Sequence, residues 1–286
     1  MLEFSALQDF HPVVMTPSHD GKYFHNYVVS LLGFVVECER RGVRVDVFMK
    51  KGESLVTRAR NDCVAAFLAN KAWTHLFWID SDIGFSPEAA FRLLQSDYDV
   101  AAGVYPLKTE RWPENGVPQG MTQTQFYQTY TRYPVNTGLS PSGMVEINVQ
   151  PDGFLRLSEA PTGFMLIKRR VFERLMTAYP ELQYVPDGLS DVDQGLHYRF
   201  FDAVVDPQSR RYLSEDYGFC RLWHALGESV YVDANSNLSH EGAKSYRGDF
   251  SASLKNALPF AVGGPAGAQM RLQGSEYLRA NPPPRA

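Results

Sequence analysis

A regular alternation of short apolar segments and amphipathic segments over the first hundred residues most constrains the fold. Strand–helix repeats of this length predict a mixed, mainly parallel α/β sheet flanked by helices. Ligands of such sheets bind beyond the carboxyl ends of the strands, so we expect the site at residues 16–21 and 80–83. The alternation predicts strands at 13–15, 43–49, 75–79 and 100–105, and helices at 23–41, 54–70 and from Ser86 onward.

Composition excludes several classes of protein. The 286 residues include 32 acidic and 28 basic side chains, so the net charge is −4 and a general nucleic-acid coat protein is not expected. The three cysteines are far apart and form no CxxC pair, which argues against a disulfide framework and a structural zinc site. The most apolar stretch, residues 27–36, is about half of the roughly 20 residues that a spanning helix needs. We therefore expect no membrane insertion and a cytoplasmic location, which is the host cytoplasm if a phage encodes the chain.

The second half of the chain is less regular. Residues 106–143 are rich in Pro, Gly, Thr, Gln and Tyr and carry Trp112 and Phe126, which predicts a long functional loop. Residues 151–153 (PDG) predict a hairpin turn between two strands. We expect one domain over 1–262, with a nucleotide-sugar-binding half (12–105) and an acceptor half (106–250), and a C-terminal tail over 263–286. Further strands are predicted at 164–167 and 229–233, and helices at 170–179 and 215–226.

Two acids end the most apolar strand. Asp80 and Asp82 follow HLFWI, and hard divalent cations such as Mg²⁺ and Mn²⁺ prefer such oxygen ligands. Haloacid-dehalogenase-type phosphatases also place an acid pair after an apolar strand, but their signature continues DxDxT. Here the fifth position is Gly84, and the pair follows the third strand, so a phosphohydrolase is a lesser alternative.

Polar residues also gather at the start of the second helix. Arg58 and Asn61 lie on the face opposite its apolar stripe, and Arg60 flanks that stripe. A solvated helix face is one interpretation of this pattern. The other is a diphosphate site, because guanidinium groups and amides in a first turn bind phosphate oxygens.

Two later motifs carry groups suited to catalysis. Glu215 and Asp216 begin a helix, where acids are favoured by the helix dipole but where a carboxylate can also act as a general base. His240 is followed closely by Lys244, Tyr246 and Arg247. This loop is a candidate source of one metal ligand and several phosphate donors.

Together these motifs resemble a glycosyltransferase of the GT-A fold. ESLVTRARN followed by FWIDSDIGFSP is most similar to DxD-containing, nucleotide-sugar-dependent enzymes of bacteria and phages, with a more distant similarity to fungal mannan mannosyltransferases. APTGFMLIKRRVFERL, LSEDYGFCRLWHALG and LSHEGAKSYRGDF continue the similarity. It covers residues 13–250, and the order and spacing of the motifs carry it.

The resemblance implies a metal site and a donor site. Asp82 and His240 would bind Mn²⁺ or Mg²⁺, and Asp80 would contact the metal through water or the ribose. The donor would be a nucleotide sugar, with UDP favoured. The residues implied to contact it, besides the acid pair, are Thr16 and Pro17 at the base and ribose, Arg58, Arg60 and Asn61 at the diphosphate, Ser81 within the DxD motif, and Lys244 and Tyr246 over the phosphates.

The resemblance also implies a catalytic base and an acceptor side. Asp216 would be the base of an inverting enzyme, with Glu215 as the alternative base or an acceptor ligand, and Gly163 and its neighbours would help form the acceptor side. The mannan enzymes retain the anomeric configuration, so the stereochemistry stays open.

The acceptor would be a hydroxyl group, either on a hydroxymethylpyrimidine of phage DNA or on a glycan or protein. A DNA acceptor would use the basic clusters at 50–51, 168–170 and 210–211. Two alternatives from other classes are a DxD metal-dependent phosphohydrolase and a catalytically silent nucleotide-binding module.

Overall fold

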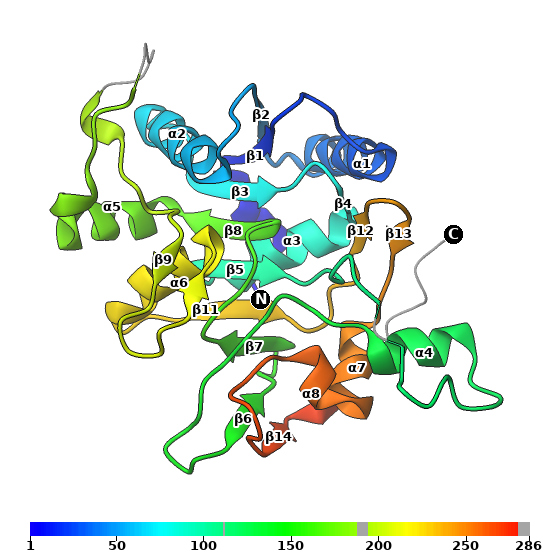
Figure 1. Ribbon diagram of the computed structural model, residues 1–286. Helices are drawn as coiled ribbons and strands as arrows, with labels where there is room; N and C mark the ends of the chain where they lie inside the picture. Colours follow the sequence, from blue (N-terminus) through cyan, green and yellow to red (C-terminus); the bar gives the residue numbers. More distant parts are fainter. Residues whose placement is uncertain (111, 188–193, 280–286) are drawn as a thin grey trace.

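The computed structural model describes residues 1–110, 112–187 and 194–279 and is built around a seven-stranded sheet (Figure 1). The strand order is β2-β1-β3-β8-β5-β11-β7, in which β8 and β7 are antiparallel to their neighbours and the other strands are parallel to one another. The mixed, mainly parallel α/β sheet expected from the sequence is confirmed. Its strands are β1 (Pro12–Ser18), β2 (Asp46–Lys51), β3 (His75–Ile79), β5 (Val100–Gly103), β7 (Phe154–Leu157), β8 (Phe164–Lys168) and β11 (Val230–Asp233).

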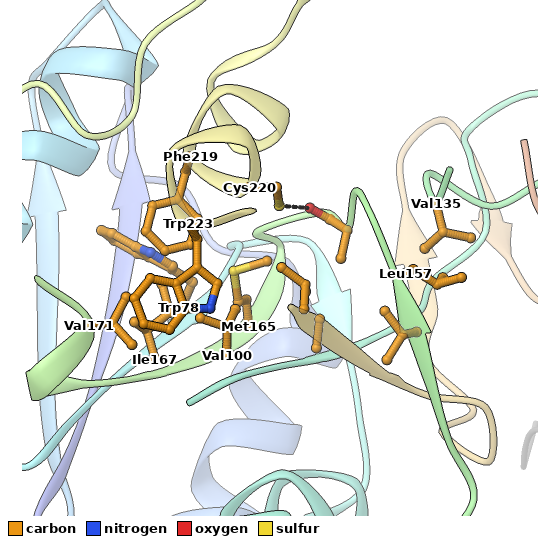
Figure 2. Close-up of a cluster of buried hydrophobic side chains, with 14 of the residues drawn as sticks. Trp78, Val100, Val135, Leu157, Met165, Ile167, Val171, Phe219, Cys220 and Trp223 are labelled. Atoms are coloured by element: carbon orange, nitrogen blue, oxygen red, sulfur yellow. Dashed lines mark hydrogen bonds between the residues drawn. The ribbon is translucent and has the colours of Figure 1, made fainter. Parts of the chain in front are cut away.

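Helices cover both faces of this sheet, and alternate strand residues point to the two sides. In β3, Phe77 and Ile79 pack with α1 and α3, whereas Leu76 and Trp78 pack with α2, α5 and α6. Figure 2 shows the core on the side of α2, α5 and α6, in which Trp78 lies near Phe219 and Trp223. The five flanking helices are α1 (His25–Arg41), α2 (Val56–Ala69), α3 (Pro87–Ser96), α5 (Arg169–Ala178) and α6 (Glu215–Ala225).

The ends of two helices follow local sequence signals. Ser86 caps α3 by accepting a hydrogen bond from the Ala89 amide, and Pro87 occupies the first turn. Gly42 ends α1 in a left-handed conformation at φ 68°, which glycine adopts without a steric penalty. Among the described residues, no helix is both long and apolar enough to cross a membrane.

The segment 106–143 is not loop throughout. It contains α4 (Gln123–Tyr130), whose capping box joins Thr122 and Gln125. Helix α4 packs against α7 (Phe250–Asn256), which in turn contacts α8 (Leu258–Ala261). The helix was missed because its polar, aromatic sequence has no clear apolar stripe, although the Thr-x-x-Gln capping signal was present.

The turn expected at 151–153 is present, with the Gly153 amide donating to the Gln150 carbonyl at 2.8 Å and the Gln150 amide donating to the Phe154 carbonyl at 2.7 Å. The antiparallel Val149–Leu155 bridge extends it, but β6 (Val145–Asn148) and β7 lie in different sheets. β6 instead pairs with β14 (Met270–Gln273), and Leu278 is buried in the core. Residues 270–278 of the expected tail therefore pack against the body of the protein.

The remaining elements are short strands and 3-10 turns that connect the larger elements. They are β4 (Ile83–Gly84), β9 (Val204–Val205), β10 (Tyr212–Leu213), β12 (Ser239–Glu241), β13 (Ser245–Tyr246), and the 3-10 turns η1 (Phe4–Asp9), η2 (Pro180–Leu182), η3 (Gln194–Leu196) and η4 (Ser275–Tyr277).

Candidate active site

A small antiparallel sheet brings the two halves of the site together. β12 pairs with β4, so that His240 lies opposite Ile83, directly after Asp82. Gly84 permits this approach, because a Cβ atom there would lie 2.5 Å from Ser239 Oγ and 2.6 Å from Asn26 Nδ2. The pairing places a histidine from late in the chain beside the acids that end β3.

Asp82 and His240 form the first pair of site residues. His240 Nε2 lies 3.6 Å from Asp82 Oδ2, and His240 Nδ1 lies 2.8 Å from the Pro106 carbonyl oxygen. Because a carbonyl oxygen only accepts, Nδ1 carries a proton, and Nε2 is the ring nitrogen that faces Asp82. Nε2 can donate a proton to that carboxylate or, once deprotonated, bind a metal ion.

A lysine also contacts Asp82. Lys108, from the segment that follows β5, forms an ion pair with Asp82 Oδ2. Burial by itself would raise the pKa of Asp82, but His240 and Lys108 more than offset it and lower that pKa below its usual value. No local sequence pattern indicates this contact, because Lys108 lies in an irregular segment and its partner depends on how that segment folds back.

Asp80 is held by a buried arginine. Arg60 Nη2 lies 3.0 Å from Asp80 Oδ1, and Arg60 Nε lies 3.3 Å from Glu215 Oε1. The guanidinium also lies over the Trp78 ring, 5.1 Å from its centroid. Burial opposes the charge of Arg60, but Asp80 and Glu215 outweigh it and raise the pKa of Arg60. Arg60 thus joins the acid after β3 to the acid that begins α6.

Asp216 lies next to this bridge at the start of α6. Its Oδ1 accepts a hydrogen bond from the Ser214 hydroxyl and one from the Tyr217 amide at 2.8 Å. Burial, with a contribution from the charge of Glu215, raises the pKa of Asp216 to about 6. A carboxylate of this pKa is ionised near neutral pH and is a stronger proton acceptor than an exposed aspartate.

Gly163 and Tyr105 support the turn that carries Asp80. The Asp80 amide donates to the Gly163 carbonyl at 2.9 Å, and the Gly163 amide donates to the Tyr105 hydroxyl at 3.2 Å. A Cβ atom at Gly163 would lie 2.4 Å from that hydroxyl. The buried Tyr105 ring also makes an edge contact with His240, 4.9 Å between centroids. Tyr105 was not singled out from the sequence, where it is simply the last residue of an apolar run.

Several residues expected at the donor site have other partners. The Asn61 side chain exchanges two hydrogen bonds of 2.9 Å with the Phe201 backbone, and it is buried, not on a polar face. Arg58 is paired with Glu53 at 2.6 Å on the exposed face of α2. The buried Thr16 hydroxyl lies 2.6 Å from the Tyr27 hydroxyl, while Pro17 follows it in β1. Asn61 and Arg58 are thus engaged with protein partners and are not assigned to the donor site.

The other phosphate candidates lie around the β12–β13 hairpin. Lys244 forms an ion pair with Glu110, and its ammonium group lies 5.3 Å from the centroid of the Tyr246 ring. Tyr246 pairs with His240 across the hairpin. The Ser81 carbonyl accepts a hydrogen bond from the Phe24 amide at 2.9 Å, which fixes the turn between the two acids.

Asp82 and His240 supply two possible ligands for a divalent cation. Within the described part of the chain, no three His, Cys, Asp or Glu side chains lie close enough together to hold a metal ion. Asp82 and His240 Nε2 do meet, whereas Asp80 faces Arg60. Two protein ligands fit a cation that takes its other ligands from water and from substrate phosphates, as Mg²⁺ commonly does.

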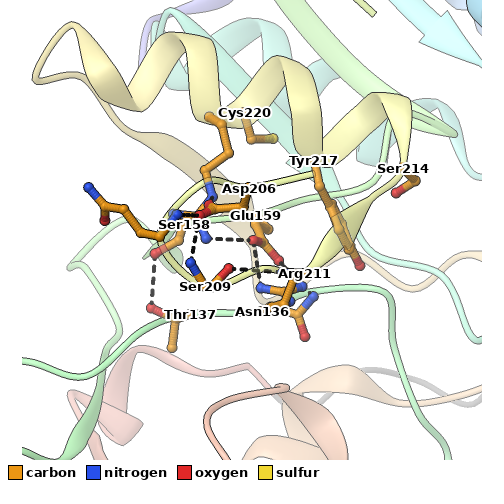
Figure 3. Close-up of polar contacts among 12 residues, drawn as sticks. Asn136, Thr137, Ser158, Glu159, Asp206, Ser209, Arg211, Ser214, Tyr217 and Cys220 are labelled. Atoms are coloured by element: carbon orange, nitrogen blue, oxygen red, sulfur yellow. Dashed lines mark hydrogen bonds and ion pairs between the residues drawn. The ribbon is translucent and has the colours of Figure 1, made fainter. Parts of the chain in front are cut away.

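The basic clusters expected to contact DNA are largely engaged in ion pairs and hydrogen bonds. Lys50 pairs with Asp62 at 3.0 Å, and Lys168 and Arg170 pair with acids at the start of β5. Arg211 binds the buried Glu159 with both terminal nitrogens at 2.9 Å, in the network of Figure 3. These cations are largely neutralised, which weakens the case for a nucleic-acid backbone partner.

Comparison with known proteins gives limited likenesses. No protein-family model matches the chain, and no curated protein sequence matches it. Similar solved structures include A197 from STIV, with 14% identity over 84% of this chain and 94% of that one, at a TM-score of 0.44. GalNAc-T7 with UDP, GalNAc and Mn²⁺ has 12% identity over 86% of this chain and 47% of that one, at 0.40. S. aureus TarS 1-349 has 14% identity over 86% of this chain and 64% of that one, at 0.32.

The chain thus spans about half of the GalNAc-T7 chain and just under two thirds of the TarS chain. A nucleotidyltransferase, the inositol-1-phosphate CTP transferase from T. maritima, is also similar, with 11% identity over 82% of this chain and 89% of that one, at a TM-score of 0.35. At these identities and TM-scores, the likenesses determine neither activity nor substrate, and the conclusions below rest on the site residues.

Proposed function

We propose that this protein is a metal-dependent glycosyltransferase of GT-A type, which transfers a hexose from a nucleotide sugar, with UDP favoured, to a hydroxyl acceptor. The main support for this proposal is that Asp82 and His240 Nε2 lie together beyond the carboxyl end of β3, at the edge where α/β sheets bind ligands. Arg60, Glu215 and Asp216 lie at the same edge. Acid, imidazole and guanidinium groups at one strand end are the set that a nucleoside diphosphate and its cation require.

Each residue has a role in this proposal. Asp82 and His240 hold the cation, which when bound would act as a Lewis acid on the diphosphate leaving group. Arg60 is a positioning residue, since both carboxylates that it bridges depend on its buried charge. Asp216 accepts the proton of the attacking hydroxyl, and its raised pKa suits that step. Lys244 and Tyr246, on the neighbouring hairpin, would close over the phosphates.

The domain limits follow the same proposal. Residues 12–105 supply the donor half, because β1, β3 and the acid pair all belong to it. Residues 106–250 supply Asp216, His240 and the segment 106–143 (the insertion), which contains α4. For the acceptor, we favour a glycan over a DNA base, because the clustered cations described above are engaged with internal partners.

A ligand panel tests the proposal. Thermal shift and hydrolysis are measured with UDP-, GDP- and dTDP-sugars, each with and without Mn²⁺. We expect a UDP-sugar to raise the melting temperature only with Mn²⁺ present, and free UDP to be released slowly. No shift and no release across the panel would overturn the proposal. Turnover of phosphomonoesters without a sugar nucleotide would favour a phosphohydrolase, and binding without release or transfer would favour a silent nucleotide-binding module.

A further inference from the structure

A pocket that shares Glu110 and Lys244 with the surroundings of the candidate active site lies against the segment 106–143. It has a volume of about 420 Å³, within the usual range for small-molecule sites. It lies between the segment after β5, the N-terminal part of α4 and the β12–β13 turn. The described residues that line it are Glu110, Trp112, Val117, Met121, Thr122, Gln123, Phe126, Tyr127 and Lys244.

The pocket contains an exposed aromatic face on a packed support. The Trp112 side chain is 65% exposed, and its ring packs against Phe126 in a tilted arrangement, at 5.0 Å between centroids and 36° between planes. Phe126 is nearly buried and contacts Tyr130 at 5.2 Å, which in turn contacts Phe260. The indole is therefore held in place by the layer beneath it, while its outer face is open to a ligand.

Polar groups suited to hydroxyls surround this face. Glu110 and Lys244 form an ion pair at one side, and Gln123 donates to the Tyr127 hydroxyl at 3.1 Å. The charged residues of the described lining are this one acid and this one base. A flat apolar face beside carboxylate, ammonium, amide and hydroxyl groups matches a pyranose ring, which has an apolar face of C–H groups and equatorial hydroxyls.

The pocket is connected to the candidate active site by the chain itself. Pro106 accepts the hydrogen bond of His240, Lys108 pairs with Asp82, and Glu110 lines the pocket. On the opposite side, Lys244 belongs to the hairpin that carries His240. A smaller hollow lined by Pro106, Glu110, Tyr127 and Tyr246 lies between the two. A sugar bound at Trp112 would thus belong to a chain that reaches toward Asp82 and His240.

From these observations we infer that the Trp112 pocket is an acceptor subsite that binds a neutral pyranose of an oligosaccharide by stacking it on Trp112. The inference rests on the proposed glycosyltransferase function and specifies its acceptor class. It assigns the aromatic residues of the insertion a role in substrate recognition.

The test uses saturation-transfer difference NMR of the full chain with maltose, cellobiose, lactose and trehalose at millimolar concentration. We expect at least one disaccharide to receive saturation on one ring face. Trp112→Ala should weaken that binding about five- to tenfold, and Trp112→Phe should retain most of it, because stacking needs an aromatic face. Leu139→Ala is the matched control, since Leu139 is an exposed apolar residue of the same insertion outside the pocket lining.

Three outcomes would overturn the inference: no disaccharide binds the wild-type chain, Trp112→Ala binds it as well as the wild type, or a single-stranded DNA oligonucleotide binds in a Trp112-dependent way instead. A parallel titration with UDP and Mn²⁺ separates the two proposals. Binding of UDP without any disaccharide would overturn the acceptor subsite alone. Disaccharide binding without UDP binding would overturn the glycosyltransferase function and leave a carbohydrate-binding pocket.

Discussion

His240 Nε2 lies 3.6 Å from Asp82 Oδ2, while His240 Nδ1 is committed to the Pro106 carbonyl. Because the Pro106 carbonyl accepts the Nδ1 proton, Nε2 is the ring nitrogen that faces the acid, where it can donate a proton to the carboxylate or, once deprotonated, bind a cation together with it. Pro106 begins the segment 106–143, which also supplies Lys108 and the Trp112 pocket. The same short segment therefore determines the orientation of the histidine and the surroundings of the acid.

Removal of either cation ligand should weaken metal-dependent nucleotide binding. Asp82→Ala and His240→Ala should each weaken binding of UDP in the presence of Mn²⁺ by about 10- to 100-fold, a range typical of changes in and around metal ligands. Isothermal titration calorimetry checks this, with Asp97→Ala as a control for an acid at the far end of the sheet, where it pairs with Lys168. Unchanged affinity in both variants would remove the metal site from the proposal.

Lys108 should compete with a cation for Asp82. Lys108→Ala removes a positive charge that contacts Asp82 Oδ2, so Mn²⁺ should bind about tenfold more tightly, which corresponds to about 1.4 kcal/mol. Lys71→Ala is the control, because Lys71 is an exposed lysine that precedes β3. The measurement is Mn²⁺ titration followed by electron paramagnetic resonance. Weaker binding of UDP with Mn²⁺ in Lys108→Ala would instead assign Lys108 to the phosphates.

Asp216 should control the pH dependence of transfer. Asp216→Asn should leave donor binding intact and reduce transfer by about 10²- to 10⁴-fold. In the wild type the base must be ionised, and its pKa is raised to about 6, so the rate should fall as the pH drops below about 6. Transfer is measured between pH 5 and 8. Full activity of the variant would place the base elsewhere or indicate a retaining mechanism.

Asp216 should also reduce stability when it is ionised. Its folded pKa of about 6 lies above the ordinary 3.8, so the protonated form is favoured in the folded state, and this stabilisation is lost as the pH rises through 6. Asp216→Asn should therefore raise the free energy of unfolding at pH 7.5 by about 1–2 kcal/mol and change it less at pH 4. Urea denaturation at the two pH values checks this. An equal loss of stability at both would contradict the assignment.

Arg60 and Arg58 offer a matched pair on one helix. Arg60→Ala leaves Asp80 and Glu215 without their shared buried partner and should destabilise the fold by about 3–5 kcal/mol. Arg58→Ala breaks only an exposed ion pair with Glu53 and should change stability little. Urea denaturation compares the two. Similar losses for both would mean that the Arg60 bridge does not stabilise the fold.

Binding to duplex DNA should be weak even at low salt. The cations at 50, 168, 170 and 211 are paired with acids, and Arg169 donates to the carbonyls at the end of α2. Fluorescence anisotropy with a labelled duplex at 50 mM and 200 mM salt checks this. Affinity that falls steeply between the two would restore a hydroxymethylpyrimidine in DNA as the acceptor.

Elements whose signals are local can be predicted from neighbouring residues alone. The strand at 75–79, the Ser86 cap of α3 and the Gly42 end of α1 depend on residues within a few positions, and the structure confirms all three. The alternation of Phe77 and Trp78 toward two cores follows from the period of a strand. The edge where the site was expected likewise follows from the general behaviour of parallel sheets.

Which charged groups contact one another depends instead on the packing of distant elements. Arg58 and Arg60 are two positions apart in the same helix, yet Arg60 lies buried between Asp80 and Glu215 and Arg58 is exposed beside Glu53. Likewise, the pairing of β4 with β12 brings His240 to Asp82, and the segment after β5 adds Lys108. These contacts join residues distant in the chain, and their geometry depends on how elements pack. No local pattern of residues carries that information.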